Sequence, residues 1–88
     1  MTLNDRKRRA LYRATHRGTR EADMLIGGFL ARYIDGWGEA ELDWAEALLE
    51  EADVDVMAWA IGKASPPARL DGALMAALRR LDFITVAR

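Results

Sequence analysis

The sequence predicts an all-α protein, a compact bundle of five short helices that ends in an extended C-terminal tail. Three observations carry this prediction. Hydrophobic residues make up 51% of the chain and recur mostly at intervals of three and four, the period of an amphipathic helix. Glycine and proline residues separate these stretches. A chain of 88 residues has room for one hydrophobic core, so we expect a single helical domain over residues 1–88.

The first two helices are expected to meet at Gly18. Asn4 is a suitable N-cap for a helix over residues 5–16. On this helix an apolar strip should lie opposite a basic strip; the first is Ala10, Leu11 and Ala14, the second Arg6, Arg9 and Arg13. The second helix should cover residues 19–34. The Gly27-Gly28 pair inside it weakens the helix and therefore predicts a bend or a close approach of another helix.

A turn over residues 35–38 precedes two acidic helices. Trp37 lies between two glycines without periodic neighbours, so we expect it to be exposed. The third helix should cover residues 39–51 and bury Leu42, Ala45, Leu48 and Leu49. Asp53 should cap a short fourth helix that Gly62 ends. Its inward face is predicted to be Val56, Trp59 and Ala60, with Trp59 mostly buried.

The last helix is expected to begin at a serine–proline pair. Ser65 as N-cap and Pro66 at the first helical position would open a helix that extends to about Leu81. Its apolar stripe is Leu70, Leu74, Leu78 and Leu81. The residues that follow, Phe83-Ile84-Thr85-Val86, have the composition of a strand. A single strand has no partner with which to form a sheet, so the sequence predicts an extended tail.

Charge is strongly segregated along the chain. Residues 1–34 carry a net charge of +5, residues 35–62 carry nine acids without any Lys or Arg, and residues 63–88 carry +3. One interpretation is that oppositely charged helices lie side by side and favour folding. The other is a bipolar surface that orients the molecule against a protein partner. The two are compatible.

The inventory of reactive side chains favours binding over catalysis. The chain contains no cysteine, one histidine (His16) and one serine (Ser65), which excludes disulfides, thiol chemistry and cysteine-based metal sites. A single histidine does not anchor a transition-metal centre. No glycine-rich phosphate-binding sequence is present. We therefore expect no enzymatic activity, no metal site and no stably bound cofactor.

The sequence also bears on location. No apolar run approaches the roughly 18 residues that span a bilayer, so we expect no direct membrane insertion. The basic start lacks the apolar region of a secretory signal. We expect a cytoplasmic protein.

The most specific local pattern is Arg-Gly-x-x-Glu at residues 17–21. It has a structural explanation: Gly18 allows a positive φ between two helices, and Glu21 complements the helix dipole. Arg17 and Arg20 would then be exposed. If the motif instead serves a function, replacing Arg17 or Glu21 with alanine should leave folding nearly unchanged but remove that function, whereas strong destabilisation would favour the structural explanation.

A second pattern lies downstream. From Leu48 to Trp59 the chain has a leucine pair, an acidic turn and a short helix with a tryptophan, and a glycine- and proline-containing break follows at residues 62–67. With the basic first helix and the Arg-Gly-x-x-Glu motif, this arrangement resembles the family of succinate dehydrogenase flavinylation factors. The resemblance extends from about Arg8 to Leu81.

The resemblance implies a function. Members of this family are five-helix assembly factors that bind the flavoprotein subunit of succinate dehydrogenase and, in some bacteria, of fumarate reductase. They promote covalent attachment of FAD to a histidine of that subunit. A chaperone of this kind would act in the bacterial cytoplasm, as a monomer, without holding FAD stably. The matching residues Arg17, Gly18 and Glu21 lie on the family's partner-binding face. We expect that surface here to comprise Arg13, His16, Arg17, Gly18, Arg20, Glu21 and Asp23.

Two alternatives remain open at this point. The basic residues of the first helix could bind nucleic acid phosphates. The sequence pI of about 5.8 and the acidic central block weigh against this, so we expect no nucleic acid partner. The chain could also be a small helical adaptor whose acidic helices bind an unrelated protein.

Overall fold

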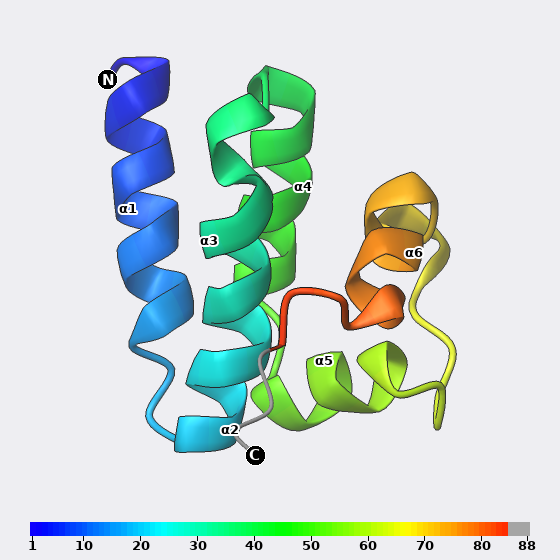
Figure 1. Ribbon diagram of the computed structural model, residues 1–88. Coiled ribbons are helices and arrows are strands. Elements are labelled where there is room, and N and C mark those ends of the chain that lie inside the picture. Colours follow the sequence, from blue (N-terminus) through cyan, green and yellow to red (C-terminus); the bar gives the residue numbers. More distant parts are fainter. Residues whose placement is uncertain (85–88) are drawn as a thin grey trace.

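A computed structural model describes residues 1–84, and these residues form helices joined by short turns (Figure 1). No strand occurs within residues 1–84, which confirms the predicted all-α class. The elements are α1 (Leu3–Thr15), α2 (Arg20–Ala22), the π-helical turn η1 (Asp23–Gly27), α3 (Gly28–Tyr33), the 3-10 turn η2 (Ile34–Gly36), α4 (Glu39–Leu49), α5 (Asp53–Ala60), the 3-10 turn η3 (Ala68–Leu70) and α6 (Ala73–Arg80). Because α2, η1 and α3 run on as one helix, the described residues contain the five predicted helices.

The helices are arranged around a row of three. In Figure 1, α1, α3 and α4 stand side by side, α5 runs sideways from below α4 and away from α1, and α6 lies above α5. One hydrophobic cluster draws residues from every helix. Within the described chain, none of the helices combines the length and apolar character that a membrane span requires.

The start of α1 differs from the prediction. Thr2, not Asn4, is the N-cap: its hydroxyl accepts a hydrogen bond from the Asp5 backbone N–H at 3.1 Å, and the Asp5 carboxylate accepts one from the Thr2 N–H at 3.2 Å. This reciprocal pair satisfies two backbone donors at once, which a cap at Asn4 does not. The hydrogen bonds from Thr2 hold the pKa of the Asp5 carboxyl below its ordinary value.

Gly27 confirms the predicted close approach of two helices. It lies in the π-helical turn η1, which packs on the end of α1. A Cβ at this position would lie 2.9 Å from Thr15 Cγ2 and 3.0 Å from the Ala14 carbonyl oxygen. Only a residue without a side chain therefore allows the two backbones to come this close. The widened turn also marks the position where the helix geometry departs from regular α.

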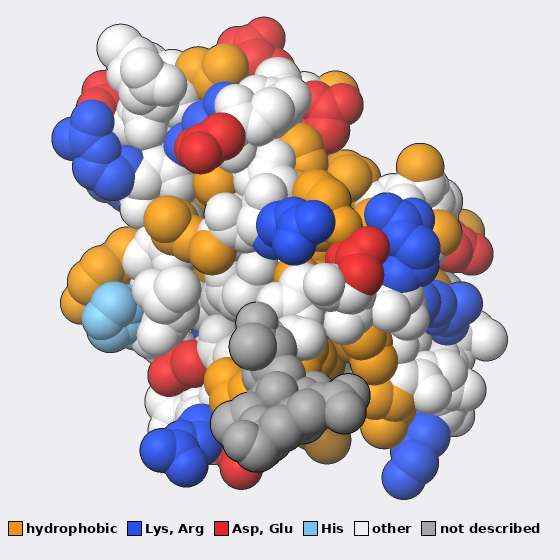
Figure 2. Space-filling model, viewed as in Figure 1, with side chains coloured by type: hydrophobic (Ala, Val, Ile, Leu, Met, Phe, Trp, Pro, Cys, Tyr) orange, Lys and Arg blue, Asp and Glu red, His pale blue; other side chains and the backbone are white. Residues whose placement is uncertain are grey.

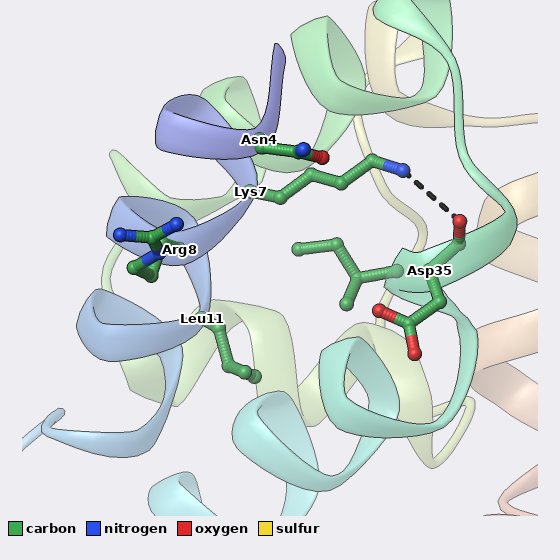
Figure 3. A pocket seen from close by; sticks show the side chains of 6 residues that line it. Asn4, Lys7, Arg8, Leu11 and Asp35 are labelled. Atoms are coloured by element: carbon green, nitrogen blue, oxygen red, sulfur yellow. Dashed lines mark hydrogen bonds between the residues drawn. The ribbon is translucent and has the colours of Figure 1, made fainter. Parts of the chain in front are cut away.

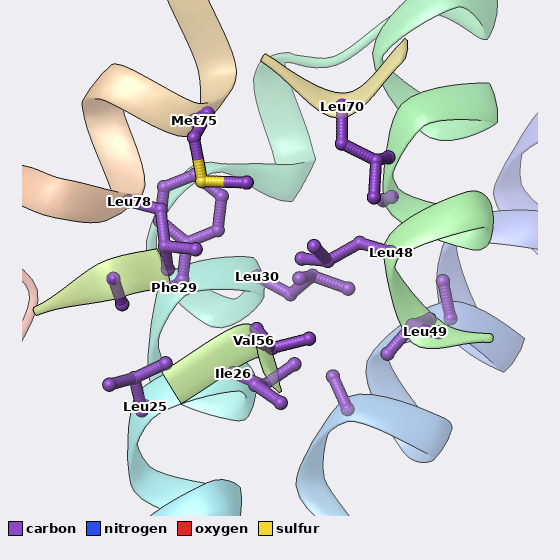
Figure 4. Packing of buried hydrophobic residues seen from close by; sticks show 14 of the residues in the cluster. Leu25, Ile26, Phe29, Leu30, Leu48, Leu49, Val56, Leu70, Met75 and Leu78 are labelled. Carbon is purple, nitrogen blue, oxygen red and sulfur yellow. The ribbon is translucent and has the colours of Figure 1, made fainter. Parts of the chain in front are cut away.

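The core is densely lined with aliphatic side chains. In Figure 4, Leu30, Leu48 and Leu70 approach one another from α3, α4 and η3, while Met75 and Leu78 of α6 point towards Phe29. The predicted inward residues of the two acidic helices are all buried; they are Leu42, Ala45, Leu48 and Leu49 on α4 and Val56, Trp59 and Ala60 on α5. The burial of Trp59, which is 7% exposed, confirms the prediction for that residue.

The prediction for Trp37 is wrong. Its side chain is 8% exposed, and its ring centre lies 5.8 Å from that of Phe29. Phe29 also contacts the rings of Tyr33, Trp44 and Phe83. The turn after α3 folds Trp37 back onto this aromatic cluster. Burial of a large aromatic surface and tilted ring contacts stabilise that arrangement, although no periodicity in the turn indicates it.

Two residues of the basic strip of α1, Arg6 and Arg13, lie against α4 and its C-terminal end, whereas Arg9 is exposed. Arg6 donates hydrogen bonds to Asp43 at 2.7 Å and to Glu46 at 2.8 Å, and Arg13 pairs with Glu50. Glu46 and Asp43 belong to α4 and hold the pKa of Arg6 above its ordinary value, and Glu50 is the C-cap residue of the same helix. Opposite charges on neighbouring helices therefore account for part of the segregation along the chain. On the face seen in Figure 2, acidic and basic side chains are interspersed.

The boundaries of the last helices differ from the prediction. α5 has Ala52 as its N-cap, with Asp53 as its first residue. Ser65 and Pro66 do not open a helix, and α6 begins only at Ala73. Pro66 precedes another proline, which disfavours the α conformation at Pro66. Leu70 is nonetheless buried, from the 3-10 turn η3.

Of the predicted extended tail, residues 83–86, the structure describes only Phe83 and Ile84. After α6, the chain turns so that the ring centre of Phe83 lies 5.3 Å from that of Phe29. The first residues after the helix thus fold onto the core. Thr85 and Val86 lie outside the described residues.

Candidate partner-binding surface

The Arg-Gly-x-x-Glu motif forms the turn between α1 and α2. Gly18 has a φ of +113°, a conformation that glycine adopts readily and other residues rarely do. On the far side of Gly18, the Thr19 hydroxyl caps α2 by accepting a hydrogen bond from the Ala22 N–H at 3.2 Å. On the near side, the Asp23 carboxylate accepts one from the Arg17 N–H at 2.5 Å. The turn is therefore held at both ends.

Arg17 ties this turn to the junction between α4 and α5. Its Nε donates to Asp53 Oδ1 at 2.8 Å, and its two terminal nitrogens donate to the carbonyl oxygens of Leu49 at 3.0 Å and Glu51 at 3.2 Å. Leu49 ends α4, where carbonyl groups lack partners within the helix, and Asp53 begins α5. One guanidinium thus joins three segments of the chain.

The prediction that Arg17 is exposed is wrong. Its side chain is only 13% exposed. The partners of Arg17 lie more than 30 residues away, and local sequence does not show which carbonyl groups a fold brings beside a given arginine. An Arg17→Ala variant is therefore not expected to fold as the parent does.

The seven predicted surface residues separate into two groups. Arg13, Arg17 and Asp23 take part in contacts within the molecule: Arg13 with Glu50 at the C-cap of α4, the other two as described above. The other four are exposed; they are His16, Gly18, Arg20 and Glu21. His16 stacks on Tyr12 with ring centres 3.9 Å apart. The surface available to a partner at this turn is therefore formed by the second group.

Sequence reasoning missed an apolar groove next to this turn. The groove has a volume of about 450 Å³ and is lined by Thr19, Asp53, Val54, Met57, Ala58, Ile61 and Lys63. A signal was present: Val54, Met57 and Ala58 of α5 and Ile61 at its C-cap have helical spacing, and they form a second apolar face beside the one that is buried.

A different hollow lies near the start of α1 (Figure 3). It is lined by Asn4, Lys7, Arg8, Leu11, Ile34 and Asp35, and Lys7 donates a hydrogen bond to the Asp35 carbonyl oxygen across it at 3.0 Å. Its volume of about 230 Å³ is below the range usual for small-molecule sites. Within residues 1–84, no group of three His, Cys, Asp or Glu side chains is placed to hold a metal ion. Neither this hollow nor the acidic side chains of residues 1–84 therefore indicate a small-molecule or metal site.

Known proteins resemble this chain over most of its length. The family model described as "Flavinator of succinate dehydrogenase" matches residues 8–82. The "FAD assembly factor SdhE" of Acetobacter pasteurianus is 42% identical over 65 residues, which are 74% of this chain and 60% of that protein. The mitochondrial "Succinate dehydrogenase assembly factor 2" of Saccharomyces cerevisiae (strain ATCC 204508 / S288c) is 38% identical over 58 residues, which are 66% of this chain and 36% of that protein.

The corresponding factor of Candida glabrata is 41% identical over 58 residues, covering 66% of this chain and 38% of that protein. The matched regions are thus less than two thirds of the length of these relatives. The family match nevertheless includes the motif turn, the acidic helix α4 and the helix α5, which lines the apolar groove. This chain belongs to the family of flavinators of succinate dehydrogenase.

Proposed function

We propose that this protein is an assembly factor that binds the flavoprotein subunit of succinate dehydrogenase and promotes covalent attachment of FAD to it. The family match over residues 8–82 carries the proposal. The structure supports it by holding the motif turn rigidly while leaving Gly18, Arg20 and Glu21 exposed to a partner. Ordered, exposed charges of this kind suit charge-assisted hydrogen bonds across an interface.

The proposed role is to bias the conformation of the partner. Flavin attachment proceeds with charge building on the isoalloxazine ring, and preorganised polar groups lower the barrier of such a step. In this proposal those groups belong to the flavoprotein. The assembly factor binds the competent arrangement more tightly than others and so shifts the population towards it. It performs no catalytic turnover of its own.

The proposal also covers the client proteins, the oligomeric state and the location of the factor. We extend it to the flavoprotein of fumarate reductase as a second client, and we propose that the factor acts as a monomer in the bacterial cytoplasm. The nucleic-acid alternative is not favoured, because Arg6 and Arg13 of the basic helix are paired with acids of α4 and its C-cap. Those acids also weaken the attraction of the helix for phosphates.

Replacing Glu21 with glutamine is expected to remove most of the assembly activity while leaving the fold intact. The side chain is exposed, so loss of its charge should change the free energy of unfolding by less than about 1 kcal/mol. The measurement mixes apo-flavoprotein with free FAD and quantifies the flavin that remains on the partner after denaturation. Wild-type protein should raise that yield several-fold over no addition, and the variant should not.

Glu39→Gln is the matched control, because Glu39 is also an exposed acid in the first turn of a helix, far along the chain from the motif. It should behave as wild type. If covalent flavin is the same with and without the wild-type protein, the assembly-factor proposal fails and the adaptor alternative takes its place.

The isolated protein is expected to bind FAD weakly or not at all. The chain has no phosphate-binding glycine loop, and its hollow near α1 is small. The larger α5 groove is lined mainly by apolar side chains, which do not suit the diphosphate of FAD. Titration of FAD fluorescence with the purified protein measures this directly. Tight stoichiometric binding would instead indicate a carrier that delivers the cofactor.

A further inference from the structure

The apolar groove along α5 exposes hydrophobic side chains that the described core does not use. Val54 is 73% exposed and Ile61 is 53% exposed, while Met57 and Ala58 between them are half-buried. Figure 2 shows hydrophobic side chains at the surface over α5. Clustered apolar residues framed by charged ones are typical of interaction sites, whereas single exposed apolar residues are ordinary.

The groove is continuous with the motif turn. Thr19, which follows Gly18, lines it, and so does Asp53, which Arg17 binds through its Nε at 2.8 Å. Arg17 therefore positions α5 against the turn, so that both surfaces are presented together. A partner seated on Arg20 and Glu21 would meet the groove beside them.

The exposed surface of the motif turn is too small to form a stable interface by itself, so a neighbouring contact is expected. A stable interface buries about 800 Å² on each partner, with an apolar centre and a polar rim. The exposed residues of the turn are mainly polar and few; they are His16, Gly18, Arg20 and Glu21. The α5 groove supplies the apolar surface that the turn lacks, while the turn supplies polar groups at its rim.

The two charged side chains that line the groove differ in what they can offer a partner. Asp53 is paired with Arg17, whereas Lys63, beyond the end of α5, is exposed. A segment lying along the groove would be complementary if it were apolar in the middle and acidic towards Lys63. The four apolar residues spaced along one face of α5 suit an amphipathic segment of a folded partner.

We propose that the α5 groove docks an amphipathic, apolar-centred segment of the flavoprotein subunit, as a second contact beside the Arg-Gly-x-x-Glu turn. The inference rests on the proposed function. Two adjoining contacts fix the orientation of the partner as well as its position. The groove supplies affinity, and the turn supplies the contact that favours flavin attachment.

The test uses Ile61→Glu, which places a charge in the groove at a side chain that is already half exposed. Binding of the purified variant to apo-flavoprotein is measured by calorimetry, beside its thermal melt and the covalent flavin yield. We expect affinity to fall by about tenfold or more, with a melting temperature close to that of wild type. Because only affinity is affected, a saturating concentration of the variant should restore the flavin yield, which Glu21→Gln should not.

Two variants serve as controls. Ala40→Glu adds the same charge at an exposed position near the start of α4 and should retain wild-type affinity, and Ile61→Leu should as well. Removal of residues 85–88, which lie outside the described part of the chain, should leave affinity unchanged.

The outcomes distinguish the two proposals. If wild-type protein neither binds the flavoprotein nor raises covalent flavin, the proposed function fails and the groove proposal fails with it. If wild-type protein does both and Ile61→Glu binds equally well, only the groove proposal is overturned. It is also overturned if the wild type sediments as a dimer that Ile61→Glu dissociates, since a second copy then occupies the groove. Tighter partner binding after removal of residues 85–88 would instead show that the chain's own end occupies it.

Discussion

Replacing Arg17 with alanine is expected to lower the free energy of unfolding by about 3 kcal/mol, enough to reduce the melting temperature by roughly 10–20 °C. The change removes a mostly buried guanidinium from an ion pair with Asp53 and from two carbonyl oxygens, those of Leu49 and Glu51. The Asp53 carboxylate, 28% exposed, is left without its cation, and the end of α4 loses its donor. Thermal and urea unfolding of the purified variants measure the effect.

Arg20→Ala is the matched control for this prediction. Arg20 belongs to the same motif but its side chain is exposed, so its loss should change stability by no more than about 0.5 kcal/mol. Arg17→Lys should fall between the two, because an ammonium can pair with Asp53 but cannot reach three acceptors in the same fork geometry. An Arg17→Ala protein that melts with the wild type would show that these contacts do not hold the turn in solution.

Loss of activity in the Arg17→Ala variant can result from destabilisation alone. If the variant no longer supports flavin attachment, unfolding or displacement of the turn is sufficient to explain it. Activity should therefore be compared at a temperature where the melt shows the variant to be folded. Glu21 and Arg20 do not need this precaution, since both are exposed.

Replacing Gly27 with valine is expected to lower the free energy of unfolding by about 2–3 kcal/mol. A Cβ at this position meets the Ala14 carbonyl oxygen at 3.0 Å and Thr15 Cα at 3.1 Å. Both are backbone atoms of α1, so they move only if the whole helix moves. Separation of α1 from η1 would also disturb the motif turn that directly follows α1. Urea unfolding and the covalent flavin yield should both register the change.

Gly28→Val is the matched control, because the two glycines are neighbours in one helix. A Cβ at Gly28 would meet only the Phe83 ring, at 3.3 Å, and that ring can shift. The gain in helix propensity over glycine offsets part of the remaining cost, so we expect a change within about 1 kcal/mol. Equal destabilisation by the two substitutions would mean that the close approach at Gly27 is not what requires glycine.

The sequence by itself determined the helical class, the five helices and the buried faces of α4 and α5. These properties depend on spacing within one helix: the apolar residues of α4 and α5 fall on one side whatever surrounds them. The turn at Gly18 was also predictable, because a positive φ there depends only on a few adjacent residues. It also indicated the close approach at Gly27, because a glycine pair inside a helix requires a reason beyond the helix itself.

Only the tertiary structure decided the roles of Arg17, Trp37 and the outer face of α5. Arg17 is a structural residue because the fold brings the end of α4 and the start of α5 beside it. Trp37 is buried because a turn folds it onto Phe29. The groove exists because Thr19 meets α5 across the motif turn, while nothing else among residues 1–84 covers Val54 and Ile61. Each of these depends on which distant segments become neighbours, and periodicity within a helix shows which face turns inward but not what that face will meet.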